Sequence, residues 1–156
     1  MKLTAFTDYS LRVLIYLAAD APRRATIAEI AAAFKVSENH LTKVVHFLGK
    51  QGWLSTVRGK GGGITLAIAP AAIGVGEVIR RTEGEPLPAE CFESDGGHCP
   101  IARCCRLKGV LAEAVDAFYA VLDKYSLADL ARHPQALARV LHFTGSAALA
   151  TARVAH

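Results

Sequence analysis

The chain contains 156 residues, 52% of them hydrophobic, which is enough for one domain with an extension and a substantial core. Its formal net charge of +4 favours an anionic partner such as nucleic acid, although many enzymes are equally basic. No apolar run approaches the roughly 18–20 residues that span a bilayer, and Asp8 and Arg12 interrupt the apolar core that a signal peptide needs. We therefore expect a cytoplasmic protein without membrane contact, in which thiols stay reduced.

The first predicted element is a helix over residues 6–19. Its apolar residues recur with helical spacing over a broad face, which predicts that this face is buried. Thr7 and Asp8 stand where an N-cap and a first-turn acid are expected, and the stretch Asp20-Ala-Pro22 ends the helix.

Two short helices follow, at residues 27–33 and 38–51. Thr26 and Glu29 have the spacing of a capping box at the start of the first, and Ser37 is the expected cap of the second. Two short helices joined by a tight turn are typical of a helix-turn-helix, whose second helix reads DNA. The polar residues expected to face outward from it are Glu38, Asn39, His40, Thr42, Lys43 and His46. We predict that Asn39, His40 and Lys43 contact DNA; the alternative is the solvated face of an ordinary helix.

A β-hairpin is predicted directly after the second helix. Its strands, at 53–58 and 64–68, flank the Gly-rich turn 59–63, which brings Arg58 and Lys60 to the tip. A hairpin in this place is a wing, because its glycines allow close approach and its cations neutralise phosphates. An ordinary Gly-rich hairpin is the alternative, and the spacing of a nucleotide-binding P-loop is absent. Together these elements predict binding to double-stranded operator DNA.

All four cysteines lie within residues 91–105, a stretch whose Gly and Pro residues predict a loop. Thiols crowded on a loop predict a bound metal or an iron–sulfur cluster. The alternatives are zinc, with His98 as a further ligand, and redox-active thiols without a metal; two disulfides are expected only in a secreted chain. The adjacent Cys104 and Cys105 fit a compact zinc site poorly, because successive side chains point apart.

A longer helix is predicted over residues 104–124, after a short one at 75–83. Its apolar positions recur at spacings of 4, 3, 4, 3 and 4, which is the pattern of a coiled-coil seam. Packing on a second copy predicts a homodimer, which suits palindromic operators; packing on the first helix of the same chain is the alternative. The seam residues are Leu107, Leu111, Ala114, Phe118, Val121 and Tyr125.

The expected fold class is therefore mainly α with a small β-hairpin: a winged helix-turn-helix with a long dimerisation helix. The DNA-binding domain is predicted at 1–72, and the cysteine loop with the dimerisation helix at 73–132. A capping-box pattern at Ser126 predicts one more short helix, which His133-Pro134 stops. The tail at 133–156 carries no motif, and both a helix and a loose segment remain open for it.

Five blocks of the sequence resemble NsrR-type regulators, which are nitric-oxide-sensing iron–sulfur repressors within a wider family of winged-helix regulators. The blocks occur in the family's order and cover about residues 1–131. They are M-K-L-T-A-F-T-D-Y-S-L-R, V-S-E-N-H-L-T-K-V-V, V-R-G-K-G-G-G-I-T-L, C-R-L-K and Y-S-L-A-D-L.

The resemblance implies a homodimeric repressor with one iron–sulfur cluster per subunit, with [4Fe-4S] favoured over [2Fe-2S] and both open. By position in the family's motifs, the cluster ligands are Cys91, Cys99 and Cys105, with Asp8 of the partner subunit as the fourth. Nitric oxide would attack the irons and release operator DNA. A signal from iron or redox status is the alternative within this class. An enzyme or electron carrier is disfavoured, because no nucleotide site or acid–base constellation is present.

The chain departs from the family pattern within the cysteine loop. Seven residues separate Cys91 from Cys99, more than in the family, and Cys104 is an extra thiol. A related group places a histidine ligand three residues after the last cysteine, where this chain has Lys108, which cannot bind metal while protonated. The alternative role for Asp8 is to stabilise its own helix by about 0.3–1 kcal/mol.

Overall fold

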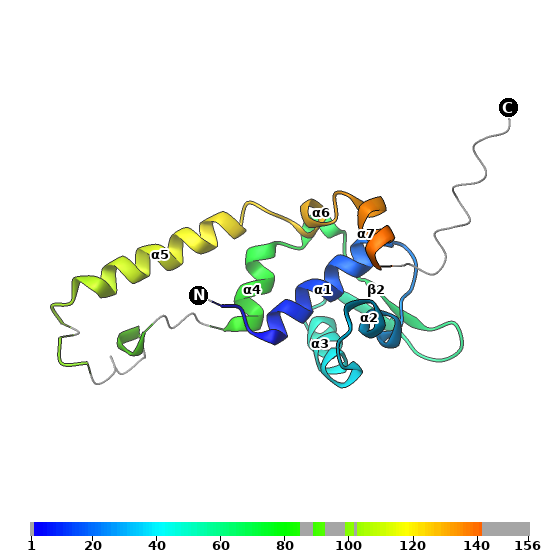
Figure 1. Cartoon of the computed structure of the whole chain (residues 1–156), viewed down its shortest axis with the longest axis horizontal. Helices are drawn as coiled ribbons and strands as arrows, with labels where there is room; N and C mark the ends of the chain where they lie inside the picture. Colours follow the sequence, from blue (N-terminus) through cyan, green and yellow to red (C-terminus); the bar gives the residue numbers. More distant parts are fainter. Residues whose placement is uncertain (1, 85–88, 93–98, 102, 142–156) are drawn as a thin grey trace, which may run out of the picture.

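The computed structural model describes residues 2–84, 89–92, 99–101 and 103–141 of the chain. It shows a helical head with a hairpin on one side and a single long helix on the other (Figure 1). The expected fold class, mainly α with a small hairpin, is confirmed. None of the described helices is both long and apolar enough to cross a membrane. The elements are α1 Ala5–Ala19, α2 Ile27–Phe34, α3 Glu38–Lys50, β1 Leu54–Val57, β2 Gly63–Leu66, η1 Pro70–Ala72, α4 Val75–Glu83, η2 Glu90–Phe92, α5 Arg106–Leu122, α6 Leu127–Leu130 and α7 Pro134–Leu141.

Helix α1 lies at the centre of the head and packs against α2, α3, α4, α6, α7 and β2. Its N-cap is Thr4, whose side chain accepts a hydrogen bond from the Thr7 N–H. The prediction that Thr7 caps the helix is therefore wrong. Thr7 is fully buried instead, and its hydroxyl donates to Thr82 at the end of α4 at 2.8 Å.

The same junction binds the start of α1 to the last turn of α4. The Thr4 N–H donates to the Glu83 carboxylate at 2.7 Å, and the Thr4 hydroxyl also donates to it. Burial raises the pKa of Glu83, but hydrogen bonding to Thr7 and Thr4 outweighs it and holds this pKa below its usual value. The end of α4 is thus fixed beside the first turn of α1, the helix that carries Asp8.

Helices α2 and α3 form the predicted helix-turn-helix. The capping box of Thr26 and Glu29 is confirmed. The turn passes through Lys35, which adopts the left-handed conformation with φ 54°. Ser37 occupies the N-cap of α3 but makes no side-chain cap hydrogen bond. The buried face of α3 enters the main core, so its opposite face is left to solvent; the buried residues are Leu41, Val44, Val45 and Leu48.

The predicted hairpin is formed by β1 and β2, which pair antiparallel with Leu54 opposite Leu66 and Val57 opposite Gly63. A Cβ at Gly62 would lie 2.3 Å from the Val57 carbonyl oxygen, so the turn needs glycine there. Ala25 pairs with Ile64, which ties the hairpin to the chain before α2.

The C-terminal elements return to the head. Helix α5 spans Arg106–Leu122 rather than the predicted 104–124, so Tyr125, the last residue of the predicted seam, lies beyond it. Pro134 does not only end a helix: it is the first residue of α7, a position that suits proline because the N–H it lacks would have no partner. Leu141 of α7 is buried in the main core, so the first part of the tail packs against α1.

Candidate DNA-binding surface and cysteine loop

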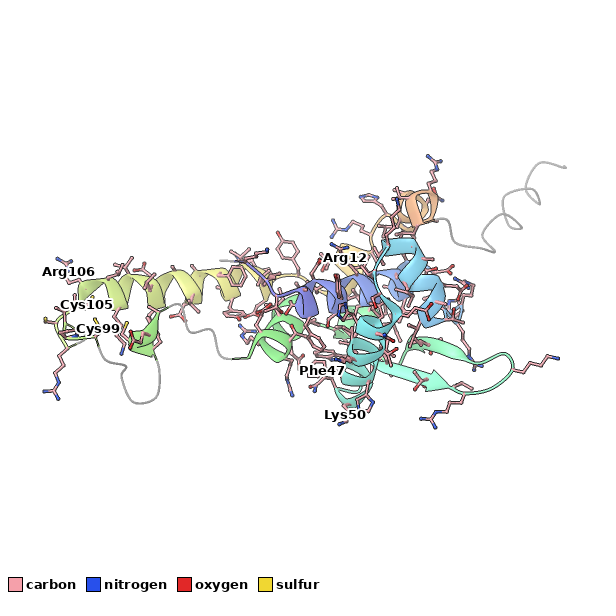
Figure 2. All side chains as sticks on the ribbon, turned by 60° about the horizontal axis from the view of Figure 1, so that its bottom comes forward. Arg12, Phe47, Lys50, Cys99, Cys105 and Arg106 are labelled. Carbon is pink, nitrogen blue, oxygen red and sulfur yellow. The ribbon has the colours of Figure 1, made fainter. Side chains whose placement is uncertain are left out.

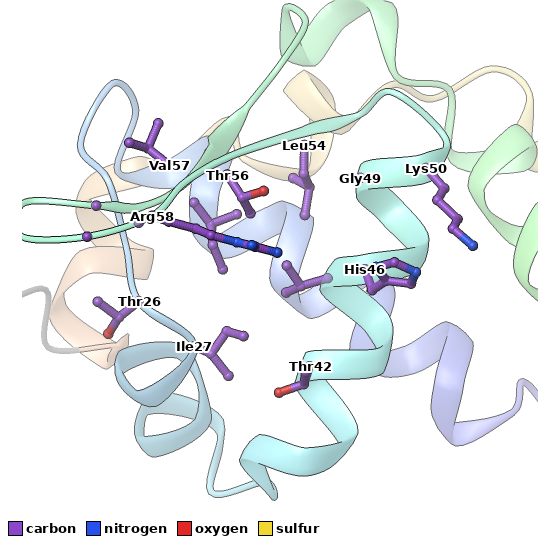
Figure 3. Close-up of a pocket in the computed structure, with 15 residues that line it drawn as sticks. Thr26, Ile27, Thr42, His46, Gly49, Lys50, Leu54, Thr56, Val57 and Arg58 are labelled. Carbon is purple, nitrogen blue, oxygen red and sulfur yellow. The ribbon is translucent and has the colours of Figure 1, made fainter.

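A groove of about 790 Å³ lies between α3 and the hairpin, closed on one side by the start of α2 (Figure 3). From α3 it is lined by Thr42, His46 and Lys50, which are four residues apart and therefore share one face of the helix. Arg58 lines the opposite wall and extends from the hairpin across the groove. Hydroxyl, imidazole and cationic groups thus surround a space bounded by the recognition helix and the wing.

The predicted DNA contacts do not all lie in this groove. Arg58 lines it, whereas Asn39, Lys43 and Lys60 are exposed on neighbouring surfaces of α3 and the hairpin turn. His40 is exposed but stacks on Tyr9 of α1, with ring centroids 6.2 Å apart and an interplanar angle of 25°. His40 therefore faces the α1 side of the recognition helix.

Lys50 is a residue of the groove that the sequence analysis missed. Its spacing of four residues from His46 is the signal that would have found it. The charge of this region suits a polyanion, since Glu38 is the sole acidic residue between positions 38 and 68. Arg24 supports the turn of the hairpin by donating to the Gly61 carbonyl oxygen at 3.2 Å.

The first two turns of α1 contact the recognition helix directly. Phe6 meets Phe47 edge to face, with ring centroids 5.3 Å apart, and Tyr9 stacks on His40. The Arg12 guanidinium lies 5.9 Å from the Tyr9 ring centre and 5.8 Å from that of Phe34 at the end of α2. A shift of this part of α1 would therefore change its contacts with both helices of the DNA-binding motif.

Asp8 lies on the same turns of α1. Its carboxylate forms an ion pair with Arg12, with an N–O distance of 2.7 Å and a second hydrogen bond of 3.0 Å. This arrangement matches the helix-stabilising alternative for Asp8. The Asp8 side chain is 44% exposed, so it is also accessible to a second subunit.

The cysteines lie at the far end of α5. Cys105 is its N-cap residue, and Figure 2 shows Cys99 at the same end of the molecule, away from Arg12 and Phe47 in the head. Cys91, on η2, is buried; the Lys108 ammonium lies 5.6 Å from the ring centre of the adjacent Phe92, which connects η2 with the first turn of α5. Cys104 is exposed, and its thiol donates to the Ile101 carbonyl oxygen at 3.5 Å.

The donor set fits an iron–sulfur cluster in kind. All four thiols are free, and no side chain caps the start of α5, so its first amide N–H groups are available to sulfur atoms at Cys105. Among the described residues, however, no three Cys, His, Asp or Glu side chains are gathered closely enough to hold a metal ion. The loop would have to draw its thiols together, and His98 lies outside the described residues.

The position of α5 separates these thiols from Asp8 of the same chain. Tyr119, near the other end of α5, packs against α4 in the head. The fourteen residues from Cys105 to Tyr119 span about 21 Å of helix. A ligand set that joins the cysteine loop to Asp8 therefore fits two subunits better than one.

Comparison with known proteins identifies the class. Residues 3–133 match the model of the Rrf2 family, described as an iron-dependent transcriptional regulator. The HTH-type transcriptional regulator NsrR of Bacillus subtilis is 48% identical over 142 residues, covering 90% of this chain and 97% of that protein. NsrR of Geobacillus kaustophilus is 50% identical over 131 residues, covering 83% and 89%. The resemblance to NsrR-type regulators is confirmed, as is the prediction that the chain is not an enzyme.

Solved structures agree with this assignment. CymR, the global cysteine regulator of B. subtilis, superposes with a TM-score of 0.65 and 32% identity, covering 85% of this chain and 97% of that one. IscR of T. potens gives a TM-score of 0.68 and 27% identity, covering 85% and 87%. The winged helix-turn-helix and the long helix are thus common to these regulators. The chain belongs to the Rrf2 family of transcriptional regulators.

Proposed function

We propose that this regulator is a homodimeric repressor that senses nitric oxide through an iron–sulfur cluster bound between its subunits. The observation that carries the proposal is the position of Asp8 on α1, between the aromatic contacts that hold the recognition helix. A ligand at that position would connect a cluster with the helix that contacts the recognition helix.

On DNA, α3 would enter the major groove, which is about 12 Å wide and admits a helix. Asn39 and Lys43 project from its first half, and Thr42 and His46 from the face toward the wing. Arg58 and Lys60 on the hairpin would bind phosphates. Lys50 joins this set, because it lies at the end of the groove that Arg58 crosses.

The homodimer rests on an apolar stripe along α5. The exposed residues recur at spacings of 3, 4, 3 and 4, and three of them, Leu107, Val110 and Val121, are more than half exposed. A second copy of the same helix would cover this stripe. This exposed stripe differs in part from the seam predicted from the sequence, because Phe118 packs with Tyr119 on the head of its own chain. The exposed stripe consists of Leu107, Val110, Ala114, Ala117 and Val121.

For the cluster we propose Cys91, Cys99 and Cys105 of one subunit and Asp8 of the other, with [4Fe-4S] favoured over [2Fe-2S]. Thiolates suit iron, and a carboxylate is the weakest of the four ligands. When bound, the cluster supplies iron atoms that react with nitric oxide. Cys104 is exposed beside the third ligand and takes no part.

Asp8 then has two alternative partners, the cluster of the other subunit and its own Arg12. In this structure Asp8 is paired with Arg12. Because Arg12 lies over the rings of Tyr9 and Phe34, a change of partner at Asp8 would alter the contacts of α1 with both helices of the DNA-binding motif. Such coupling need supply only about 1.4 kcal/mol for a tenfold change in operator affinity.

The test is anaerobic purification, followed by counting of iron and sulfide and by titration of operator DNA before and after nitric oxide. We expect about four irons per chain and a fall in operator affinity after nitric oxide. A colourless protein with one zinc per chain would contradict the cluster, and unchanged operator binding would contradict the sensing. A regulator of iron status would instead lose affinity with a chelator and not with nitric oxide.

A further inference from the structure

Among the described residues, the apolar contacts of α5 with the head lie in its C-terminal half. Tyr119, close to its C-terminus, packs against Val75 and Ile79 of α4. The N-terminal half extends away from the head (Figure 1), and Cys105 lies at its start. The joint between α4 and α5 therefore decides where the far end of α5 lies.

A bidentate ion pair spans this joint. The Arg80 guanidinium donates two hydrogen bonds to the Asp123 carboxylate, at 2.7 and 2.6 Å, and lies 4.4 Å from the centre of the Tyr119 ring. Two parallel hydrogen bonds between planar groups fix both distance and orientation, which a single contact does not. Both side chains are nearly half exposed, so the pair contributes little to folding stability.

The backbone fits closely around this pair. A Cβ at Gly76 would lie 2.0 Å from the Asp123 carboxylate oxygen, so the carboxylate occupies space that any larger residue would take. The Val75 N–H donates to the Tyr125 carbonyl oxygen at 2.9 Å, and the Leu127 N–H to that of Ile73 at 2.8 Å. The start of α4 and the end of α5 are thus fixed to each other by backbone and side-chain bonds together.

We propose that Arg80 and Asp123 are positioning residues that set the direction of α5 and thereby the separation of the two DNA-binding heads in the dimer. The inference rests on the proposed homodimer. A change of about 10° at the joint would move the far end of α5, about 21 Å away, by about 4 Å. Half-sites on DNA are read at a fixed separation, so a displacement of this size alters which separation the dimer fits.

The experiment compares binding to duplexes that differ in half-site spacing. The wild-type protein first selects a duplex from a random-sequence pool, and variants of that duplex are then made with one or two base pairs added or removed between the half-sites. We expect Arg80→Gln and Asp123→Asn to reduce the preference for the selected spacing by about tenfold while leaving affinity for a single half-site unchanged. Small-angle scattering of the free dimer should show a changed radius of gyration, a readout that requires neither DNA nor cluster.

Two further variants distinguish positioning from a general loss of structure. The exchange Arg80→Asp with Asp123→Arg should restore the spacing preference, because it re-forms the pair. Arg81→Gln is the matched control: Arg81 carries the same charge on the same helix but contacts Glu77 and Gln51 rather than α5. We expect the control to behave as wild type.

Each outcome decides between the proposals. If Arg80→Gln keeps the spacing preference, or if the exchange fails to restore it, the positioning role is wrong while the proposed repressor stands. If Arg80→Gln also loses single half-site binding, the ion pair maintains the structure of the DNA-binding head rather than the direction of α5, and the inference is overturned. If the wild-type protein selects no duplex with two half-sites, the proposed dimeric repressor fails first.

Discussion

Neighbouring residues in the cysteine loop have different surroundings. Cys105 occupies the N-cap position of α5, whereas Cys104 is exposed and hydrogen-bonds within its own turn. We predict that Cys105→Ala loses the cluster, because one of three thiolates is missing, and that the matched control Cys104→Ala keeps it. The measurement is iron and sulfide per chain after anaerobic purification. A full cluster in Cys105→Ala and none in Cys104→Ala would assign the third ligand to Cys104.

The outward-facing side chains of the recognition helix could be predicted, because their spacing determines on which face of the helix they lie. Thr42 and His46 were expected to face outward, and they line the groove with Lys50. The stacking of His40 on Tyr9 was not predictable, because nothing in local spacing brings residues 31 positions apart into contact. Such contacts depend on the angle between α1 and α3.

Helix limits were predictable where local chemistry determines them. The capping boxes at Thr26 and Ser126 begin their helices as expected, because both partners lie within one turn. The start of α1 was predicted to within one residue, but its N-cap was placed one turn too late, at Thr7 instead of Thr4. Thr4 and Thr7 are both able to cap, and the hydrogen bond from Thr7 to Thr82, distant in sequence, decides between them.

Helix α6 gives a prediction at the level of an element. Hydrogen bonds from Ser126 and the nearby Arg132 lower the pKa of Asp129 to about 2. Its unfolded pKa is about 3.9, so its stabilising effect is complete above that value and is lost as the pH falls toward 2. We expect Asp129→Asn to lower the melting temperature at pH 6, and the gap from wild type to narrow between pH 4 and 3, as thermal unfolding by circular dichroism will show. If the difference in melting temperature were independent of pH, the charge of the Asp129 carboxylate would not contribute to stability.

For the molecule as a whole, periodicity correctly located the long helix and its apolar character but not the face left open. Helix α5 carries more than one apolar stripe, and a pattern of threes and fours does not say which one its own head covers. Phe118 and Tyr119 meet α4, and this contact leaves Val110 and Ala117 outward in place of Leu111 and Phe118. The two stripes are adjacent, so the choice depends on tertiary packing alone.

The open stripe is tested by placing a charge on it. Val110→Asp would bury an unpaired carboxylate in each half of the proposed interface, which costs several kcal/mol and should raise the dimer dissociation constant by about 100-fold or more. Ala120→Asp adds the same charge at an exposed position outside the stripe and should leave the dimer intact. Sedimentation velocity at several protein concentrations measures both. If Val110→Asp remains dimeric while Leu111→Asp dissociates, the seam expected from periodicity is the true interface, and α5 must then turn on its axis when the subunits meet.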